Sequence, residues 1–226
     1  MKIGTTNNLL ELAPTLAGNF TEFEVRQSVF DAYHKWFNSH NEDMGIPGKY
    51  FGGYRLHDSD ILSIQKCNRK DLLLRLSDMA TTQFACALID KKKIPLAKTE
   101  LEFPVEIISS GTKHLSLNEV DIEGGIHPCR FRQLSEFLYV EIIEWQNRSI
   151  EIAFDLWKHG GYPNNRFLLL LSCEALKIAE YQKTKWNEYF GDTYDEYYEY
   201  FCNELNKGVY LSDYTLCSEL IDNIGK

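Results

Sequence analysis

The feature that most constrains this chain is a two-residue alternation of apolar and polar side chains, which recurs between residues 60 and 157. The stretch TELEFPVEII, residues 99–108, puts its branched and aromatic apolar residues on one face and its glutamates on the other. Because successive side chains of a β-strand point to opposite faces, this pattern predicts strands with one face in a core and the other in water. Pro104 lacks a backbone N–H donor, so we expect this strand at the edge of a sheet.

Two stretches predict β-hairpins. Residues 60–76 alternate on both sides of the turn CNRKD, and EFLYVEIIEWQNRSIEIAFDLW, residues 136–157, alternates on both sides of QNRS. The Asn-Arg pair in both turns suggests a duplicated meander, although the match is too short to decide this. We also expect one short strand in TQFACALID, residues 82–90, and one fully apolar strand in FLLLLSCEALKI, residues 167–178.

Helical periodicity appears at the two ends of the sequence. Residues 21–39 predict an amphipathic helix, and Tyr194, Tyr198, Phe201 and Leu205 share one helical face. A last short helix is expected in LSDYTLCSELIDNI, with Ser212 or Asp213 as its N-cap. The predicted fold class is therefore α+β, with an N-terminal helix, an antiparallel β-sheet of two meander-like halves and C-terminal helices. We expect residues 1–182 to form the helix-plus-sheet domain, and the acidic, Tyr-rich segment 183–226 to pack on it as one structural unit.

The composition argues against some classes of partner and indicates the cellular compartment. A formal net charge of −9 at pH 7 repels phosphate, so we expect no nucleic-acid partner and no binding to an anionic membrane. No apolar stretch reaches the roughly 18 residues of a membrane span, and the first residues are a poor signal peptide. The six cysteines contain no C-x-x-C motif, which favours reduced thiols. These features predict a cytoplasmic protein of bacterial type.

One candidate site is the sequence His57-Asp58-Ser59-Asp60. A His and two carboxylates are typical of a metal or acid–base site, which gives one functional hypothesis, a small metal-dependent hydrolase using His57, Asp58 and Asp60. The other interpretation is structural, with Asp58 or Ser59 bonding the local backbone at the start of a strand. Because the spacing supplies no third ligand, the favoured interpretation predicts no metal and no other cofactor.

The stretches LHDSDILSI and FLYVEIIEWQNRSIEIAF resemble a group of uncharacterised bacterial β-rich domains, in which a Leu-His-Asp-Ser/Ala sequence leads into the first strand. The resemblance covers about residues 20–180. Similar domains occur among toxin-immunity and interaction modules with no established enzyme activity. The resemblance implies that His57, Asp58, Tyr139 and Glu141 are family-like positions, but it assigns them no role.

The second candidate site is WNEYFGDTYDEYYEYFCNEL, residues 186–205, which holds six carboxylates and no Lys or Arg. One interpretation is a solvated acidic face above a tyrosine-lined packing face. The other is a docking surface, since tyrosines supply contact area and carboxylates attract a basic protein. The candidate partner-binding residues are Glu188, Asp192, Tyr194, Asp195, Glu196, Tyr197, Glu199 and Tyr200.

The leading hypothesis from the sequence is therefore a non-enzymatic interaction module, an immunity-type inhibitor of a basic toxin or nuclease domain. The sequence names neither the partner nor the oligomeric state.

Overall fold

The computed structural model describes residues 35, 37–51, 55–68, 70–121, 125–158, 166–207, 211 and 213–224. Residues 37–40 are helical, and nearly all of the helix predicted over 21–39 lies outside the described residues. Before the sheet, the chain forms the short helices η2 (Asn41–Met44) and α3 (Ile46–Phe51).

Nine strands form one antiparallel sheet within the described residues, in the order β5-β4-β8-β7-β6-β1-β2-β3-β9. Their bounds are β1 (Ser59–Cys67), β2 (Asp71–Ser77), β3 (Pro104–Ser110), β4 (His114–Val120), β5 (Ile126–Cys129), β6 (Glu136–Gln146), β7 (Ser149–Trp157), β8 (Arg166–Cys173) and β9 (Ala175–Glu180). With helices following the sheet, the predicted α+β class is confirmed.

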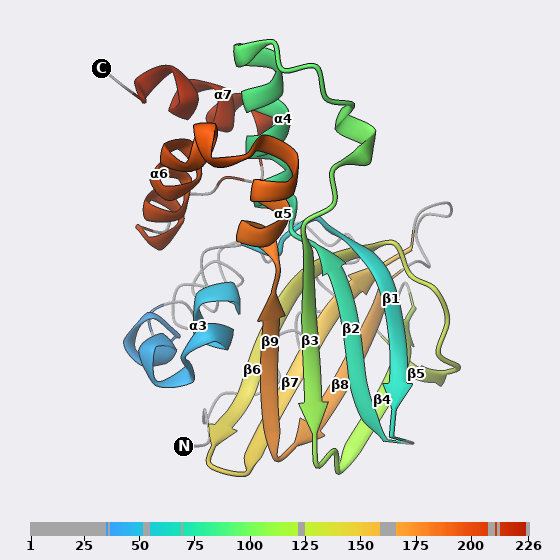
Figure 1. Ribbon diagram of the computed structural model, residues 1–226. Coiled ribbons are helices and arrows are strands. Elements are labelled where there is room, and N and C mark those ends of the chain that lie inside the picture. Colours follow the sequence, from blue (N-terminus) through green and yellow to red (C-terminus); the bar gives the residue numbers. More distant parts are fainter. Residues whose placement is uncertain are drawn as a thin grey trace, which may run out of the picture.

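The sheet folds over into two layers, which we call the β-sandwich (Figure 1). The first layer is β1-β2-β3-β9 and the second is β6-β7-β8-β4-β5. Strand β1 joins them, because Ser59 and Asp60 pair with Phe137 and Glu136 of β6 while the rest of β1 pairs with β2. The sequential neighbours β1-β2-β3 and β6-β7-β8 are the two meander-like halves that the sequence predicted.

A second connection between the layers is a bent two-stranded ribbon. One strand of the ribbon is β3 followed by β4, and the other is β8 followed by β9. In the first layer β3 pairs with β9, as far as Ser110 and Ala175. In the second layer β4 pairs with β8, from His114 and Ser172 onward. Both strands of the ribbon therefore change layer at the same corner. The prediction of one strand over residues 167–178 was wrong, because Glu174 separates β8 from β9.

Gly111 forms the inside of this corner. Its φ is +64°, and a Cβ there would lie 2.8 Å from Cγ of Glu174. The next residue is held by a side chain from β2, since Thr112 N donates to Asp71 Oδ1 at 3.1 Å. Only glycine fits this backbone conformation and this close approach without strain.

The main hydrophobic core lies between the two layers. Alternate residues of the strands point into it, and Leu72, Leu74 and Leu76 of β2 are fully buried while Leu73 between them is half-buried. The short helices contribute Met44, Tyr50 and Phe51. The alternation that predicted the strands is therefore the pattern that fills this core.

The longer helices pack together at one end of the β-sandwich, and we call this group the helical cap (Figure 1). It comprises α4 (Met79–Lys92), the segment 94–103 with η3 (Lys98–Glu100), α5 (Gln182–Phe190), η4 (Asp192–Tyr194), α6 (Asp195–Asn206) and α7 (Tyr214–Asn223). Asp213 is the N-cap of α7 and accepts from Thr215 N at 2.6 Å and from Leu216 N at 3.2 Å. The expected face of α6 packs inward, since Phe201 is fully buried and Tyr194, Tyr198 and Leu205 pack against the same cluster.

Three further expectations about the strands were wrong. The strand expected over residues 99–108 begins only at Pro104, because η3 and an irregular segment occupy the residues before it. TQFACALID belongs to helix α4, which is apolar on most sides, so a short apolar run did not distinguish a buried helix from a buried strand. Strand β3 is not at an edge, because it pairs with both β2 and β9. Pro104 is tolerated there because it is the first residue of the strand.

The two hairpins are confirmed, but their turns differ. Cys67 pairs with Asp71 across three residues, and Gln146 pairs with Ser149 across two. Among the described turn residues, Asn68 has a positive φ in the first turn and Arg148 has one in the second. The Asn-Arg pairs therefore do not occupy equivalent positions.

We expect Gly111→Ala to lower the free energy of unfolding by about 1–3 kcal/mol, because alanine must adopt a left-handed backbone conformation and also contact Glu174. Urea unfolding measures the change. The loss should be smaller when Gly111→Ala is made in a Glu174→Gly background, which removes the contact and leaves the backbone strain. An unchanged midpoint for the single variant contradicts the role assigned to this corner.

Candidate functional site

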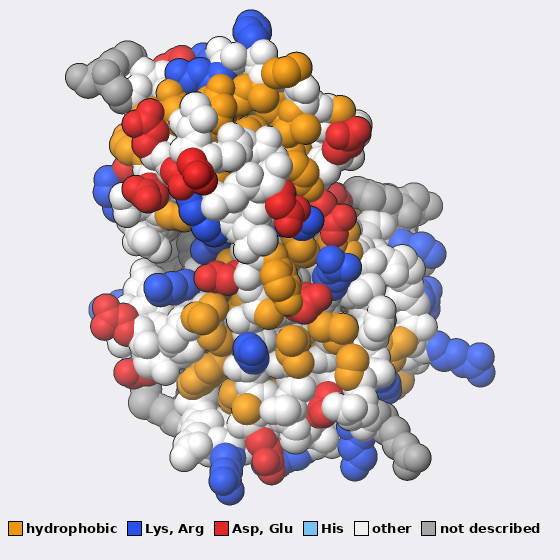
Figure 2. All heavy atoms as spheres, in the orientation of Figure 1, with side chains coloured by type: hydrophobic (Ala, Val, Ile, Leu, Met, Phe, Trp, Pro, Cys, Tyr) orange, Lys and Arg blue, Asp and Glu red, His pale blue; other side chains and the backbone are white. Residues whose placement is uncertain are grey.

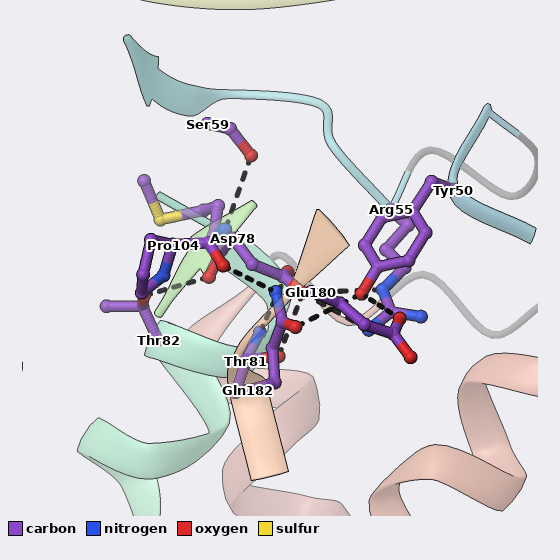
Figure 3. Close-up of polar contacts among 10 residues, drawn as sticks. Tyr50, Arg55, Ser59, Asp78, Thr81, Thr82, Pro104, Glu180 and Gln182 are labelled. Carbon is purple, nitrogen blue, oxygen red and sulfur yellow. Dashed lines mark hydrogen bonds and ion pairs between the residues drawn. The ribbon is translucent and has the colours of Figure 1, made fainter. Parts of the chain in front are cut away.

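A network of polar side chains, exposed at Glu180 and otherwise buried or half-buried, lies where the helical cap meets the β-sandwich (Figure 3). We call it the seam and define it by Tyr50, Arg55, Asp78, Glu180 and Gln182. These residues lie on or beside the ends of β2 and β9, on α3 and on the turn before β1. The seam thus draws together parts of the chain that are far apart in sequence.

Asp78 is the central residue of the seam. It is fully buried and is the N-cap of α4, with Oδ1 accepting from Thr81 N at 3.2 Å and Oδ2 accepting from Thr81 Oγ1 at 3.0 Å. Both Nε and Nη2 of Arg55 donate to Oδ2 at 3.3 Å. Every one of these donors stabilises the carboxylate form, so a buried charge is tolerated.

Arg55 also stacks on an aromatic ring, its guanidinium carbon lying 3.9 Å from the ring centre of Tyr50. The Tyr50 hydroxyl donates to Glu180 Oε2 at 2.6 Å and lies 3.2 Å from Gln182 Oε1. Burial raises the pKa of Tyr50, while the charge of Arg55 opposes the rise, so the phenol stays protonated. The pKa of Arg55 is lowered by burial but raised more by Asp78 and its other neighbours, so the guanidinium stays charged.

Helix α6 reaches the seam through Tyr198 and Cys202. Burial raises the pKa of Tyr198, and Cys202 adds to the rise while Arg55 opposes it. Burial also raises the pKa of the Cys202 thiol, although its hydrogen bond with Tyr198 and the charge of Arg55 oppose this. A thiol with a raised pKa is a poor nucleophile, so these groups are suited to holding the cap rather than to covalent chemistry.

In the predicted site at His57, Asp58 and Asp60, the first two side chains contact each other, while Asp60 lies apart from them on strand β1. His57 Nδ1 lies 2.9 Å from Asp58 Oδ2, and Asp58 has a φ of 60°. Ser59 is buried and accepts from Met79 N at 3.3 Å, whereas Asp60 is exposed. Within the described ranges, no group of three or more His, Cys, Asp or Glu side chains is arranged to hold a metal ion.

A second buried ion pair lies in the second layer. Arg166 donates from Nε to Asp155 Oδ1 at 2.8 Å and from Nη2 to Oδ2 at 2.6 Å, in a bidentate arrangement. Burial raises the pKa of Asp155, and the charges of Arg166 and His57 oppose the rise. His57 therefore lies close enough to act on this carboxylate.

The backbone register brings the family-like positions to the same region. Tyr139 pairs with Asp155, Glu141 pairs with Ala153, and two residues after His57 the chain pairs with β6. The side chains of Tyr139 and Glu141 lie outside what the structure describes. Sequence reasoning missed Asp155 and Arg166, although a charge within an apolar strand is itself a sign of a buried partner.

The acidic stretch divides into an inner and an outer set. Tyr197 is buried, Tyr194 packs in the cap core, Glu188 pairs with Lys185 and Asp195 pairs with Lys183. These four of the eight predicted partner-binding residues are therefore engaged within the chain.

The remaining four form what we call the acidic stripe, Asp192, Glu196, Glu199 and Tyr200. Their spacing of three and four residues follows one face of α6 and its preceding turn. The three carboxylates are exposed and form no ion pair with any residue that the structure describes, and Tyr200 is half-buried. An exposed acidic face and an inward packing face are thus both present, on different residues.

Comparisons with known proteins assign no relationship: no family model, no curated protein and no solved structure matches the chain. The resemblance carried by LHDSDILSI stays a prediction. Across the described residues, no helix combines the length and the apolar composition needed to cross a membrane.

We expect Arg166→Met to lower the free energy of unfolding at pH 7 by about 3–5 kcal/mol, because Asp155 becomes a buried charge without its partner. The pKa of Asp155, already raised by burial, then rises further. Only the ionised carboxylate of Asp155 is destabilised by the missing partner. The loss in the free energy of unfolding is therefore complete above the folded-state pKa of Asp155, and it shrinks as pH falls toward the pKa of about 3.9 that an aspartate has in the unfolded chain.

Urea unfolding of the wild type and the variant at several pH values measures this. The double variant Asp155→Asn/Arg166→Met, which has no buried charge, should regain stability at pH 7 and lose the pH dependence. An equal loss at every pH for the single variant contradicts this explanation.

Proposed function

We propose that the chain is a non-enzymatic, cytoplasmic interaction module that binds a basic partner protein through the acidic stripe. One observation carries the proposal: Asp192, Glu196 and Glu199 face solvent without an ion-pair partner among the described residues, while neighbouring carboxylates are paired. Glu188, Asp195 and Glu204 are neutralised by Lys185, Lys183 and Lys207. Lys92 lies near enough to Glu196 to interact with its charge, so the charges of Asp192 and Glu199 are the ones most available to another molecule.

The stripe has the properties that speed the arrival of a basic protein. Its negative charge has the same sign as the net charge of −9, so the local and the overall fields both attract a cationic surface. Tyr200 adds partly exposed aromatic surface, of the kind enriched in interfaces. The stripe is rigidly presented, because Tyr197 and Phe201 on the opposite side of α6 are buried in the cap.

A partner that uses Arg and Lys groups to bind phosphate fits this surface, because carboxylates compete with phosphate for the same groups. An inhibitor of a basic toxin or nuclease domain acts in this way. The resemblance of LHDSDILSI to domains found among toxin-immunity modules supports the same proposal.

The hydrolase alternative gains no support from the described geometry. Asp58 is engaged with His57, and Asp60 follows the buried Ser59 on an alternating strand and is exposed. The three side chains therefore do not converge on one point, as a catalytic metal requires.

The double charge reversal Glu196→Lys/Glu199→Lys should abolish capture of the partner. A close charge pair at an interface is worth at least about 1.5 kcal/mol, which is roughly tenfold in affinity. We expect affinity capture from a lysate of the source cells to retain a basic protein on the wild type at low salt, and to release it as salt screens the exposed charges. Calorimetry with the purified partner then measures the affinities of the wild type and the variant.

The control is Glu42→Lys/Asp43→Lys, which makes the same change in net charge at two exposed positions of η2. The control should keep the partner, and circular dichroism should show that both variants fold. Equal binding by the stripe variant and the control contradicts the proposal.

A further inference from the structure

The helical cap and the β-sandwich have separate hydrophobic cores. Among the described residues, no buried side chain belongs to both the sandwich core and the cap core. Aromatic contacts between described residues also stay within one core or the other, as in Phe51 with Phe154 and Phe84 with Trp186. In Figure 2 the described residues of the cap form the upper part of the molecule and those of the sandwich form the lower part.

The chain crosses from one lobe to the other at neighbouring strand ends. The crossings follow β2 at Asp78, precede β3 at Phe103 and follow β9 at Tyr181, and these three strands are adjacent in the first layer. Hydrogen bonds tie the crossings together, since Asp78 N donates to Phe103 O at 2.8 Å and Gln182 Nε2 donates to Pro104 O at 3.5 Å. In the part of the chain that the structure describes, the cap is therefore attached along one line at the end of one layer, which is the geometry of a hinge.

Two side-chain contacts of the seam reach the crossings from elements that precede β1. Arg55, which precedes β1, pairs with Asp78 at one crossing, and Tyr50 of α3 donates to Glu180 next to another. The Tyr50 ring belongs to the sandwich core while its hydroxyl reaches the seam. Apolar packing tolerates small shifts, but an ion pair between buried groups holds only in a narrow range of distance and angle.

We infer that the helical cap and the β-sandwich are two separately cooperative units, and that the Arg55–Asp78 ion pair and the Tyr50–Glu180 hydrogen bond lock the cap in one orientation. When the seam is broken, the cap opens or unfolds as a unit while the sandwich keeps its structure. The seam is thus a conformational device whose state sets where the cap lies. The inference does not depend on the proposed binding of a basic protein.

Native-state hydrogen exchange of the full chain, read by mass spectrometry, tests this with Arg55→Met. Amides of α4, α5 and α6 should exchange at least about tenfold faster than in the wild type, because the cap opens without global unfolding. Amides of β2, β3, β7 and β8 should change by less than about threefold.

The matched control is Arg166→Met, which breaks a buried Arg–Asp pair inside the sandwich. It should accelerate exchange in β7 and β8 without opening the cap selectively. Tyr50→Phe keeps the aromatic ring under Arg55 and removes the hydrogen bond to Glu180, so it gives a smaller selective effect in a variant that folds even if Arg55→Met does not.

Equal acceleration in cap and sandwich for both seam variants overturns the inference, because it shows one cooperative unit. Unchanged exchange in both lobes overturns it as well, because the seam then holds nothing in place. Selective acceleration in the cap supports it, whether or not the acidic stripe binds a partner.

Discussion

The structure depends on the ion pair between Arg55 and Asp78. Asp78 directly follows strand β2 of the sandwich, caps the first helix of the cap and accepts two hydrogen bonds from Arg55. A fully buried carboxylate is costly unless all of its partners are present, so its burial selects one arrangement of the surrounding elements. The two hydrophobic cores supply most of the stabilisation, while this pair and its neighbours determine how the cores are placed relative to each other.

The sequence predicted the fold where the local pattern was sufficient. Alternation located β1, β2, β6 and β7, and a short polar sequence located each hairpin turn. Helix α4 was missed because its apolar side chains face the cap core on most sides and leave no stripe. The break between β8 and β9 was missed because it depends on Gly111, which is more than 50 positions away along the chain.

The candidate site was predictable to a smaller degree, for a related reason. A run of carboxylates is visible in sequence, and helical spacing indicated that α6 has an inward tyrosine face. Which carboxylates are free depends on lysines that tertiary structure places nearby, as Lys183 is placed beside Asp195. Buried ion pairs are harder still, since Arg55 and Asp78 stand 23 positions apart and neither lies in a recognisable motif.

The bent ribbon at Gly111 has a consequence for synthesis on the ribosome. Strand β3 finds its second neighbour only in β9, and β4 lies between β5 and β8, so each waits for a partner made much later. Helix α4 likewise buries its apolar surface against helices that begin after residue 181. Pairings between distant segments form slowly, and an unpaired strand edge favours aggregation. A nascent chain that has reached only β7 therefore exposes an open sheet edge and an uncovered apolar helix, and it depends on the last quarter of the chain to close both.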